Sequence, residues 1–307
     1  MEVQKPQSQE KNNDLWFRDR ALKSLQKLGP RTWDYSDSLL LYTPKAEVGY
    51  ESIQKGKDPY AEHVTKPERT YLDNIAASVV QELPSGFDFV DLGPGTAHKE
   101  QFIFDAAKAQ GKEFRYVPVD ASSYYLKQGV LYASEQGITV APVQSAFEEV
   151  ANKLERGRPR FVSLGLTFTN YAPQQALAML SEIAGEKSKY FIDVQIRDRV
   201  PMDTIVALYE SSMGPIISEK LKLLGIDPKA DVSEYSIDEG VRVWYTLKNV
   251  PKSLAEVGVL PGDRLLTFQS LRYTKEEFEA VLRESGSAYK MFDTGGPFIG
   301  ALVSTER

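Results

Sequence analysis

The chain contains no cysteine and only two histidines, His63 and His98. Without cysteine it can form neither a disulfide bond nor a thiolate metal site. Two histidines are also too few for an ordinary histidine-rich metal centre. The composition therefore predicts a protein without a metal site.

An excess of basic residues is missing as well. The 37 Lys and Arg residues are outnumbered by 43 Asp and Glu residues, which gives a formal net charge of -6. Proteins that bind nucleic acids usually carry a basic stripe, often with interleaved aromatic residues, and this sequence has no such stripe. We therefore expect no nucleic-acid partner.

Long apolar runs are the third absence. No uninterrupted apolar run approaches the roughly 20 residues that a membrane-spanning helix requires. Residues 1–14 are polar, whereas a secretory signal peptide has an apolar core. These features predict a cytoplasmic protein without a membrane partner, whose residues 1–14 form a loose tail.

The overall composition, with 42% hydrophobic and 26% charged residues, is typical of a globular protein. A length of 307 residues is long for one compact core and predicts two lobes. Strand-like and helix-like segments alternate over residues 88–195, which is typical of a parallel sheet with helices on both faces. Residues 201–284 add further strand-like segments, which indicate the second lobe.

The most informative stretch, residues 87–99, reads FDFVDLGPGTAHK. An apolar run stops at Gly93-Pro94-Gly95 before a helical pattern begins, so the stretch predicts a strand, a tight turn and a helix. Such a turn lets a nucleotide-like ligand approach the backbone, although a purely structural turn uses glycine equally well. The dinucleotide fingerprint requires a third glycine where His98 stands, which argues against a nicotinamide dehydrogenase.

Polar side chains follow the next two predicted strands. Asp120 ends the segment 114–120, where a carboxylate of a doubly wound sheet commonly binds ribose hydroxyl groups. It could equally cap the helix that follows, and the two roles are compatible. Asn170 follows the apolar segment 160–165, close to the expected crevice at the carboxyl ends of the strands.

Three motifs occur in a distinctive order. They are Asp91-Leu92-Gly93-Pro94-Gly95 with Lys99, then Tyr116-Val117-Pro118-Val119-Asp120, then Leu164-Gly165-Leu166-Thr167-Phe168-Thr169-Asn170. A weaker fourth match is the helical tyrosine Tyr209. From about residue 65 to the C-terminus, the sequence resembles the histidine-specific methyltransferase family, whose members depend on S-adenosylmethionine.

This resemblance implies a fold and a domain organisation. The fold would be α/β, with the Rossmann-like doubly wound sheet of class I methyltransferases and a second, smaller α+β lobe. Residues 62–200 and 285–307 would form the domain that binds S-adenosylmethionine. Residues 1–61 and 201–284 would form the substrate-binding lobe.

The resemblance also implies roles for individual residues. The cofactor S-adenosylmethionine would be bound by Gly93, Gly95, Lys99, Asp120, Ala146 and Phe147. Asn170 would hold the amino group of the substrate and Tyr209 its carboxylate. The remaining substrate-binding positions would be Tyr60, Val243, Phe268 and Ser270.

Two departures from the family pattern concern the substrate. The family binds the imidazole of histidine with a glutamate, but this chain has Phe268 there, in Thr267-Phe268-Gln269-Ser270, and phenylalanine cannot accept a hydrogen bond. His63 stands near a family tyrosine, although Tyr60 is close enough to be the match. His63 could take the proton of the amine, and an ordinary loop histidine is the simpler interpretation.

We therefore predict an N-methyltransferase that acts on the amino group of an amino acid or amino-acid-derived small molecule other than histidine. One alternative is a histidine N-alpha-methyltransferase with an altered imidazole site. Another is a non-catalytic S-adenosylmethionine-binding protein, which would need neither Asn170 nor Tyr209. A monomer and a dimer are both compatible with the sequence.

Overall fold

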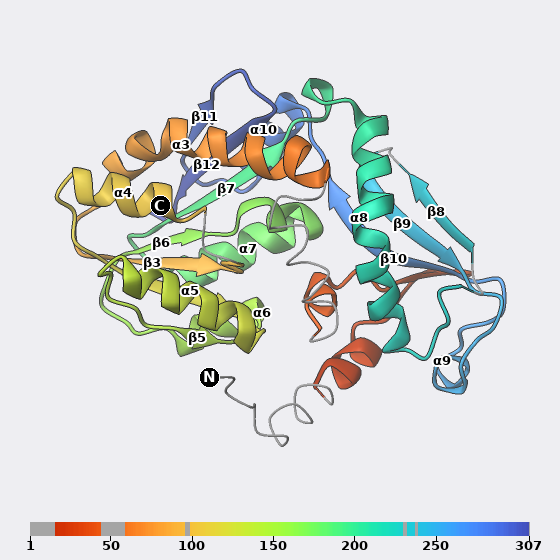
Figure 1. Cartoon of the computed structure of the whole chain (residues 1–307). Coiled ribbons are helices and arrows are strands. Elements are labelled where there is room, and N and C mark those ends of the chain that lie inside the picture. The colour runs from red at the N-terminus through yellow and green to blue at the C-terminus, as the bar shows by residue number, and fades with distance from the viewer. Residues whose placement is uncertain (1–15, 44–58, 96–98, 230–231, 237–238, 307) are drawn as a thin grey trace. The chain divides into compact units, whose positions relative to one another are not determined.

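The computed structural model describes residues 16–43, 59–95, 99–229, 232–236 and 239–306 (Figure 1). The chain forms two compact units. The smaller unit comprises Met1–Tyr60 and Met202–Leu271, and the larger unit comprises Ala61–Pro201 and Arg272–Arg307. None of the helices in the described ranges is long and apolar enough to cross a membrane.

The larger unit contains a seven-stranded sheet in the order β11-β12-β7-β6-β3-β4-β5. Its strands are β3 (Phe87–Leu92), β4 (Phe114–Asp120), β5 (Val143–Gln144), β6 (Arg160–Ser163), β7 (Lys189–Gln195), β11 (Tyr289–Asp293) and β12 (Phe298–Ser304). Strands β3 to β7 pair in parallel, whereas β12 pairs antiparallel with both β7 and β11. Strands β11 and β12 thus close one edge of the sheet as an antiparallel pair.

Helices pack against both faces of this sheet, as α3 and α7 show in Figure 1. The α-helices of the larger unit are α3 (Lys66–Gln81), α4 (Gln101–Ala109), α5 (Ser123–Glu135), α6 (Phe147–Val150), α7 (Pro173–Ala184) and α10 (Lys275–Glu284). Its shorter helical segments are η2 (Ala61–Thr65), η3 (Ala151–Lys153), η4 (Gly165–Asn170) and η5 (Arg197–Arg199). Because helices cover both faces, every residue of the central strand β3 is buried.

The order of the strands creates a topological switch point. From β3 the chain proceeds to β4 and β5 on one side of β3, and then crosses to β6 and β7 on the other side. The loops that leave β3 and β6 at their carboxyl ends therefore diverge. Ligands of doubly wound sheets bind where neighbouring loops diverge in this way.

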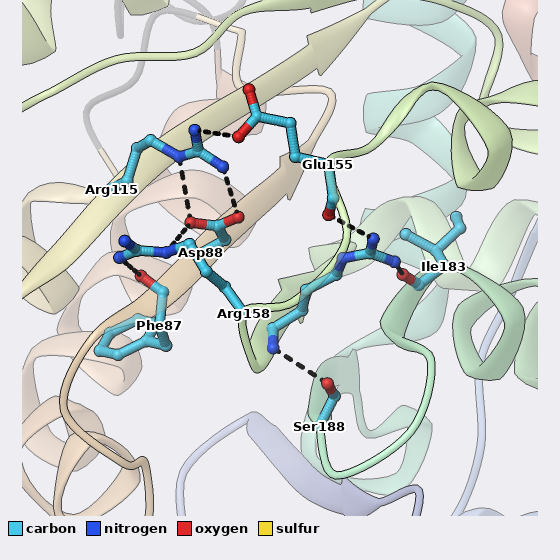
Figure 2. Close-up of polar contacts among 8 residues, drawn as sticks. Phe87, Asp88, Arg115, Glu155, Arg158, Ile183 and Ser188 are labelled. Carbon is cyan, nitrogen blue, oxygen red and sulfur yellow. Dashed lines mark hydrogen bonds and ion pairs between the residues drawn. The ribbon is translucent and has the colours of Figure 1, made fainter.

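The opposite, amino-terminal ends of these strands are held together by charged groups (Figure 2). The Asp88 carboxylate accepts from Arg115 at 2.7 Å and from Arg158 at 2.8 Å. Arg160 donates instead to two backbone carbonyls, those of Ile183 at 2.7 Å and Glu155 at 2.8 Å. These contacts join β3 to β4, to the loop before β6 and to the end of α7. They lie at the end of the sheet away from the glycine turn.

The smaller unit contains a five-stranded sheet in the order β1-β2-β10-β9-β8. Its elements are β1 (Gln26–Gly29), β2 (Thr32–Asp34), η1 (Ser38–Leu41), α8 (Met202–Lys222), β8 (Val232–Ser236), β9 (Gly240–Thr246), α9 (Lys252–Glu256) and β10 (Arg264–Leu271). Strand β2 pairs in parallel with β10, and the other pairs are antiparallel. A helix over residues 16–23 precedes β1.

The boundary between the units corrects one prediction. We expected residues 272–284 in the substrate-binding lobe, but they belong to the larger unit. The reason is that Phe278 of α10 packs against the rings of Phe168 and Tyr273, with centroids 6.3 and 6.0 Å away. The assignment of the two units to cofactor and substrate stays a prediction, and residues 1–14 lie outside the described residues.

Candidate functional site

The turn after β3 depends on glycine. Gly93 and Gly95 have φ angles of +76° and +60°, in the left-handed region that glycine adopts readily. A Cβ atom at Gly93 would lie 3.3 Å from the ring of Phe147, which is tighter than most real contacts. The backbone N–H of Gly93 donates to Val119 at 2.8 Å, which fixes the turn against β4. Gly93 and Phe147, two of the predicted cofactor residues, therefore lie side by side.

Asp120 ends β4 and is buried. Its carboxylate accepts from the backbone N–H of Ser122 at 2.8 Å. Ser122, rather than Asp120, caps helix α5, because its hydroxyl accepts from the N–H groups of Tyr124 and Tyr125. Of the two roles open to Asp120, capping the helix is therefore wrong. Binding a ribose stays a prediction.

The segment that follows β5 also approaches Asp120. Strand β5 pairs with β4 so that Gln144 lies opposite Asp120, and Ser145 donates its backbone N–H to the carbonyl of Asp120 at 3.1 Å. Ala146 precedes the first turn of α6 and Phe147 begins it, and both are buried. The structure thus brings together Gly93, Asp120 and the two apolar residues predicted to lie beside the cofactor.

A pair of buried carboxyl groups lies behind the turn. Asp91 accepts from the hydroxyl of Tyr116 at 2.7 Å, and Glu100 precedes helix α4. Burial raises the pKa of Asp91, and burial together with the neighbouring Asp91 raises the pKa of Glu100 well above its usual value. No sequence pattern distinguishes Glu100 from any other acidic residue at the start of a helix.

Lys99 forms an ion pair that the sequence did not reveal. Its ammonium group lies 2.7 Å from Glu68 Oε1, and the Glu68 side chain is almost fully buried in the first turn of α3. A glutamate in a first turn usually interacts with its own helix terminus, so the pattern gave no sign of this partner. Within the described residues, no group of three His, Asp or Glu side chains is arranged to hold a metal ion.

Two further predicted residues lie in the larger unit. Asn170 is half-buried at the end of η4. His63 is exposed in η2, where its backbone carbonyl accepts from Gln195 Nε2 at 3.0 Å. Neither position by itself establishes a catalytic role, and both stay predictions. His98 lies outside the described residues.

The smaller unit brings together the other predicted substrate residues. The hydroxyl of Tyr209, on α8, lies 3.2 Å from that of Ser270 and 3.5 Å from that of Tyr60. The ring of Tyr209 also packs against Phe268, with centroids 5.6 Å apart. Val243 pairs with Phe268 in the register of β9 and β10 and is fully buried. These five side chains form the aromatic cluster of the smaller unit.

The register of β10 decides which of its side chains face this cluster. A bulge interrupts the pairing between Leu266 and Phe268. Beyond it the side chains alternate, so Phe268 and Ser270 both contact Tyr209 while Gln269 points to the other face. Phe268 thus faces the same way as Ser270.

A family model described as histidine-specific, S-adenosylmethionine-dependent methyltransferase matches residues 23–214, more than half of the chain. The chain belongs to this family. It is a methyltransferase, and S-adenosylmethionine is its cofactor. The strand order β11-β12-β7-β6-β3-β4-β5, with β12 antiparallel to its neighbours, is that of class I methyltransferases, so the predicted fold class is confirmed.

Two curated relatives are named histidine N-alpha-methyltransferase. The histidine N-alpha-methyltransferase of Mycolicibacterium smegmatis is 24% identical over 244 residues, which cover 72% of this chain and 75% of that protein. The histidine N-alpha-methyltransferase of Mycobacterium tuberculosis is 34% identical over 99 residues. That second match spans 31% of the length of either protein.

Solved structures of methyltransferases resemble the chain more distantly. A magnesium protoporphyrin IX methyltransferase from Synechocystis with bound S-adenosylmethionine is 11% identical with a TM-score of 0.44, covering 85% of this chain and 92% of that one. A methyltransferase from Aquifex aeolicus is 13% identical with a TM-score of 0.43, covering 82% and 96%.

Proposed function

We propose that this methyltransferase acts on the α-amino group of an amino acid, or of a small molecule derived from one, whose side chain is aromatic or apolar. The observation that carries the proposal is the position of Phe268, which contacts Tyr209 beside Ser270 and is 2% exposed. Val243, paired with Phe268, makes the neighbouring position apolar too. The family pattern has a glutamate at the position of Phe268.

The physical argument compares an imidazole with an apolar ring. An imidazole N–H left without an acceptor in a closed site costs about 1–3 kcal/mol. Apolar surface buried against Phe268 is instead favourable by about 25 cal/mol per Å². Because the chain has Phe268 in place of the family's glutamate, a substrate with an aromatic or aliphatic side chain is favoured over histidine.

The residues of this chain bind and orient the reactants. When bound, S-adenosylmethionine supplies a methyl group on a positively charged sulfur. Gly93, Gly95, Lys99, Asp120, Ala146 and Phe147 are the proposed cofactor-binding residues. Asn170 is proposed to accept from the substrate amino group, and Tyr209 to bind the carboxylate, because holding the amine in line with the methyl group lowers the barrier.

The amine must lose its proton before it can attack. The exposed imidazole of His63 is the proposed acceptor of this proton, since an imidazole nitrogen can act as a general base. The aromatic surroundings of Tyr209 favour the neutral amine as well, because desolvation lowers the pKa of an ammonium group.

The proposal is tested by comparing kcat/KM for histidine with that for tryptophan, tyrosine and small apolar amino acids. We expect histidine to be the poorer substrate by roughly 10-fold or more, given the cost of an unpaired N–H. The variant Phe268→Glu should raise kcat/KM for histidine and lower it for the apolar substrates. Gln269→Glu is the matched control, because it places a carboxylate on the other face of the same strand.

A second candidate is histidine itself. It is favoured by the family description and by the names of both relatives, which are histidine N-alpha-methyltransferases. In that case Ser270, which lies 3.2 Å from Tyr209, would accept from the imidazole. The same panel separates the two candidates: if histidine is the best substrate of the unmodified protein, the argument from Phe268 is wrong.

A further inference from the structure

Two buried carboxylates flank Gly165 in the larger unit. Glu68 reaches this point from the first turn of α3 and Asp193 from β7, and each residue is 1% exposed. A Cβ atom built on Gly165 would lie 3.7 Å from Asp193 Oδ1 and 3.8 Å from Glu68 Oε1. Apart from the adjacent residues of the chain, those two oxygens are its nearest neighbours, so the absent side chain leaves room of about the size of a methyl group beside carboxylate oxygens.

One oxygen of this pair has no partner. Asp193 Oδ2 is buried and makes no hydrogen bond within the described structure. A buried carboxylate oxygen without a donor is costly, and such atoms are rare in folded proteins. Burial and the neighbouring Glu68 raise the pKa of Asp193, and the positive charge of Lys99 offsets only part of this increase.

A positive group already contacts Glu68 at the oxygen that lies near Gly165. Lys99 contacts Glu68 Oε1 at 2.7 Å, and its side chain is 39% exposed, so its ammonium group stays accessible. Lys99 follows the glycine turn after β3, and Gly165 follows β6, the strand next to β3. The three charged groups therefore lie at the switch point of the sheet, where a ligand is expected.

We propose that Asp193 and Glu68 accept the α-ammonium group in the amino-acid half of S-adenosylmethionine, in the space beside Gly165, while Lys99 binds the carboxylate of that half. The chemistry is complementary: an ammonium group has three N–H donors, and the two buried carboxylates supply acceptors, including Asp193 Oδ2. The charges match pairwise: the ammonium group of the zwitterion faces the two carboxylates and its carboxylate faces Lys99, while the zwitterion adds no net charge to the cluster. The proposal rests on the cofactor of the family and is independent of which amine is methylated.

Binding of three nucleosides, measured by calorimetry, tests this assignment. They are S-adenosylhomocysteine, the analogue in which hydrogen replaces its α-amino group, and methylthioadenosine, which lacks the whole amino-acid half. We expect Asp193→Asn to weaken S-adenosylhomocysteine binding roughly 10- to 100-fold, the range for hydrogen bonds to charged groups. Affinity for the other two nucleosides should be unchanged, because neither carries the ammonium group.

The stability of the ligand-free protein supplies an independent readout. Asp193→Asn removes an unpaired buried carboxylate while keeping the size of the side chain, so the Tm should stay the same or rise. Glu68→Gln is the second variant and should show the same selectivity among the nucleosides. Gly165→Ala is the third, because its methyl group would fill the space, although a φ of +57° also strains the backbone.

Two results would overturn the proposal. If Asp193→Asn weakens all three nucleosides equally, or lowers the Tm without any selectivity, then Asp193 has only a structural role. If binding of S-adenosylhomocysteine is unchanged while binding of the amine substrate is lost, then the carboxylates hold the ammonium group of the substrate and not that of the cofactor.

Discussion

Gly93 shows how a single residue shapes the candidate cofactor site. Any side chain there would meet the ring of Phe147 and would also require a left-handed backbone. Asp120 is equally constrained, because its carboxylate already accepts from Ser122 at the start of α5. The sequence predicted Gly93 and Asp120 as cofactor-binding residues, since each belongs to a short motif. Spacing in the sequence alone could not predict that Phe147 lies beside Gly93.

Asp120 gives a prediction at this scale. Asp120→Asn keeps an oxygen that can accept from Ser122 but loses the charge, so S-adenosylhomocysteine should bind more weakly by about 1–3 kcal/mol if Asp120 binds the ribose. Isothermal titration calorimetry measures the change. Ser122→Ala is the control, because it removes the helix cap and should cost about 1 kcal/mol of stability without changing the affinity. An Asp120→Asn protein with unaltered affinity would exclude Asp120 from the cofactor site.

At the scale of elements, helix α8 carries more than the predicted Tyr209. Its Lys220 is fully buried in the smaller unit, where its ammonium group donates to the carbonyls of Asp37 and Thr267, both at 2.8 Å. It also lies 4.8 Å from the centroid of the Tyr35 ring. These contacts join α8 to β10 and to the segment before η1. Sequence periodicity could not identify Lys220 as buried, because lysine is usually exposed.

Lys220 makes the stability of the protein depend on pH. Desolvation lowers the pKa of Lys220 from 10.5 to about 7, although Asp37 and Asp34 oppose this shift. Between these two values the unfolded chain holds a proton that the folded chain has released, so unfolding takes up a proton and the free energy of unfolding rises with pH. From pH 7 to 9 the increase should be about 1–3 kcal/mol, measured by urea denaturation.

Two variants isolate this effect. Lys220→Met should lower stability overall, because two carbonyls lose their donor, and should remove the rise between pH 7 and 9. Lys222→Met alters an exposed lysine of the same helix and should leave the rise intact. If the free energy of unfolding rises equally with pH in the unmodified protein and in Lys220→Met, then Lys220 does not titrate in this range.

At the scale of the whole molecule, the proposed cofactor residues all belong to the larger unit, whereas the aromatic cluster belongs to the smaller one. A ligand that binds only the folded state stabilises the unit that holds it. The division of the chain itself was only partly predictable: the sequence located both units, but it placed α10 in the wrong one.

Hydrogen–deuterium exchange tests this division of roles. S-adenosylhomocysteine at 100 times its Kd should stabilise its binding unit by about 2.7 kcal/mol. Amide exchange in β3, β4 and the segment around Phe147 should therefore slow by up to about 100-fold where exchange requires unfolding of that unit. Protection confined to β9 and β10 would contradict the assignment of the cofactor to the larger unit.

The sequence by itself determined what depends on a few neighbouring residues. It predicted the glycine turn at Gly93. The capping box of α10, in which Thr274 and Glu277 exchange hydrogen bonds, is equally local. Such features are set by backbone conformation and by hydrogen bonds that span only three or four residues.

Only the tertiary structure decided which distant residues meet. It placed Asp193 and Glu68 on either side of Gly165, and it turned Phe268 toward Tyr209 beyond a bulge in β10. These contacts join residues far apart in the chain, so they depend on strand register and on the packing of the core. A shift of one residue would have reversed the direction of every side chain in β10, and no local pattern in the sequence records that choice.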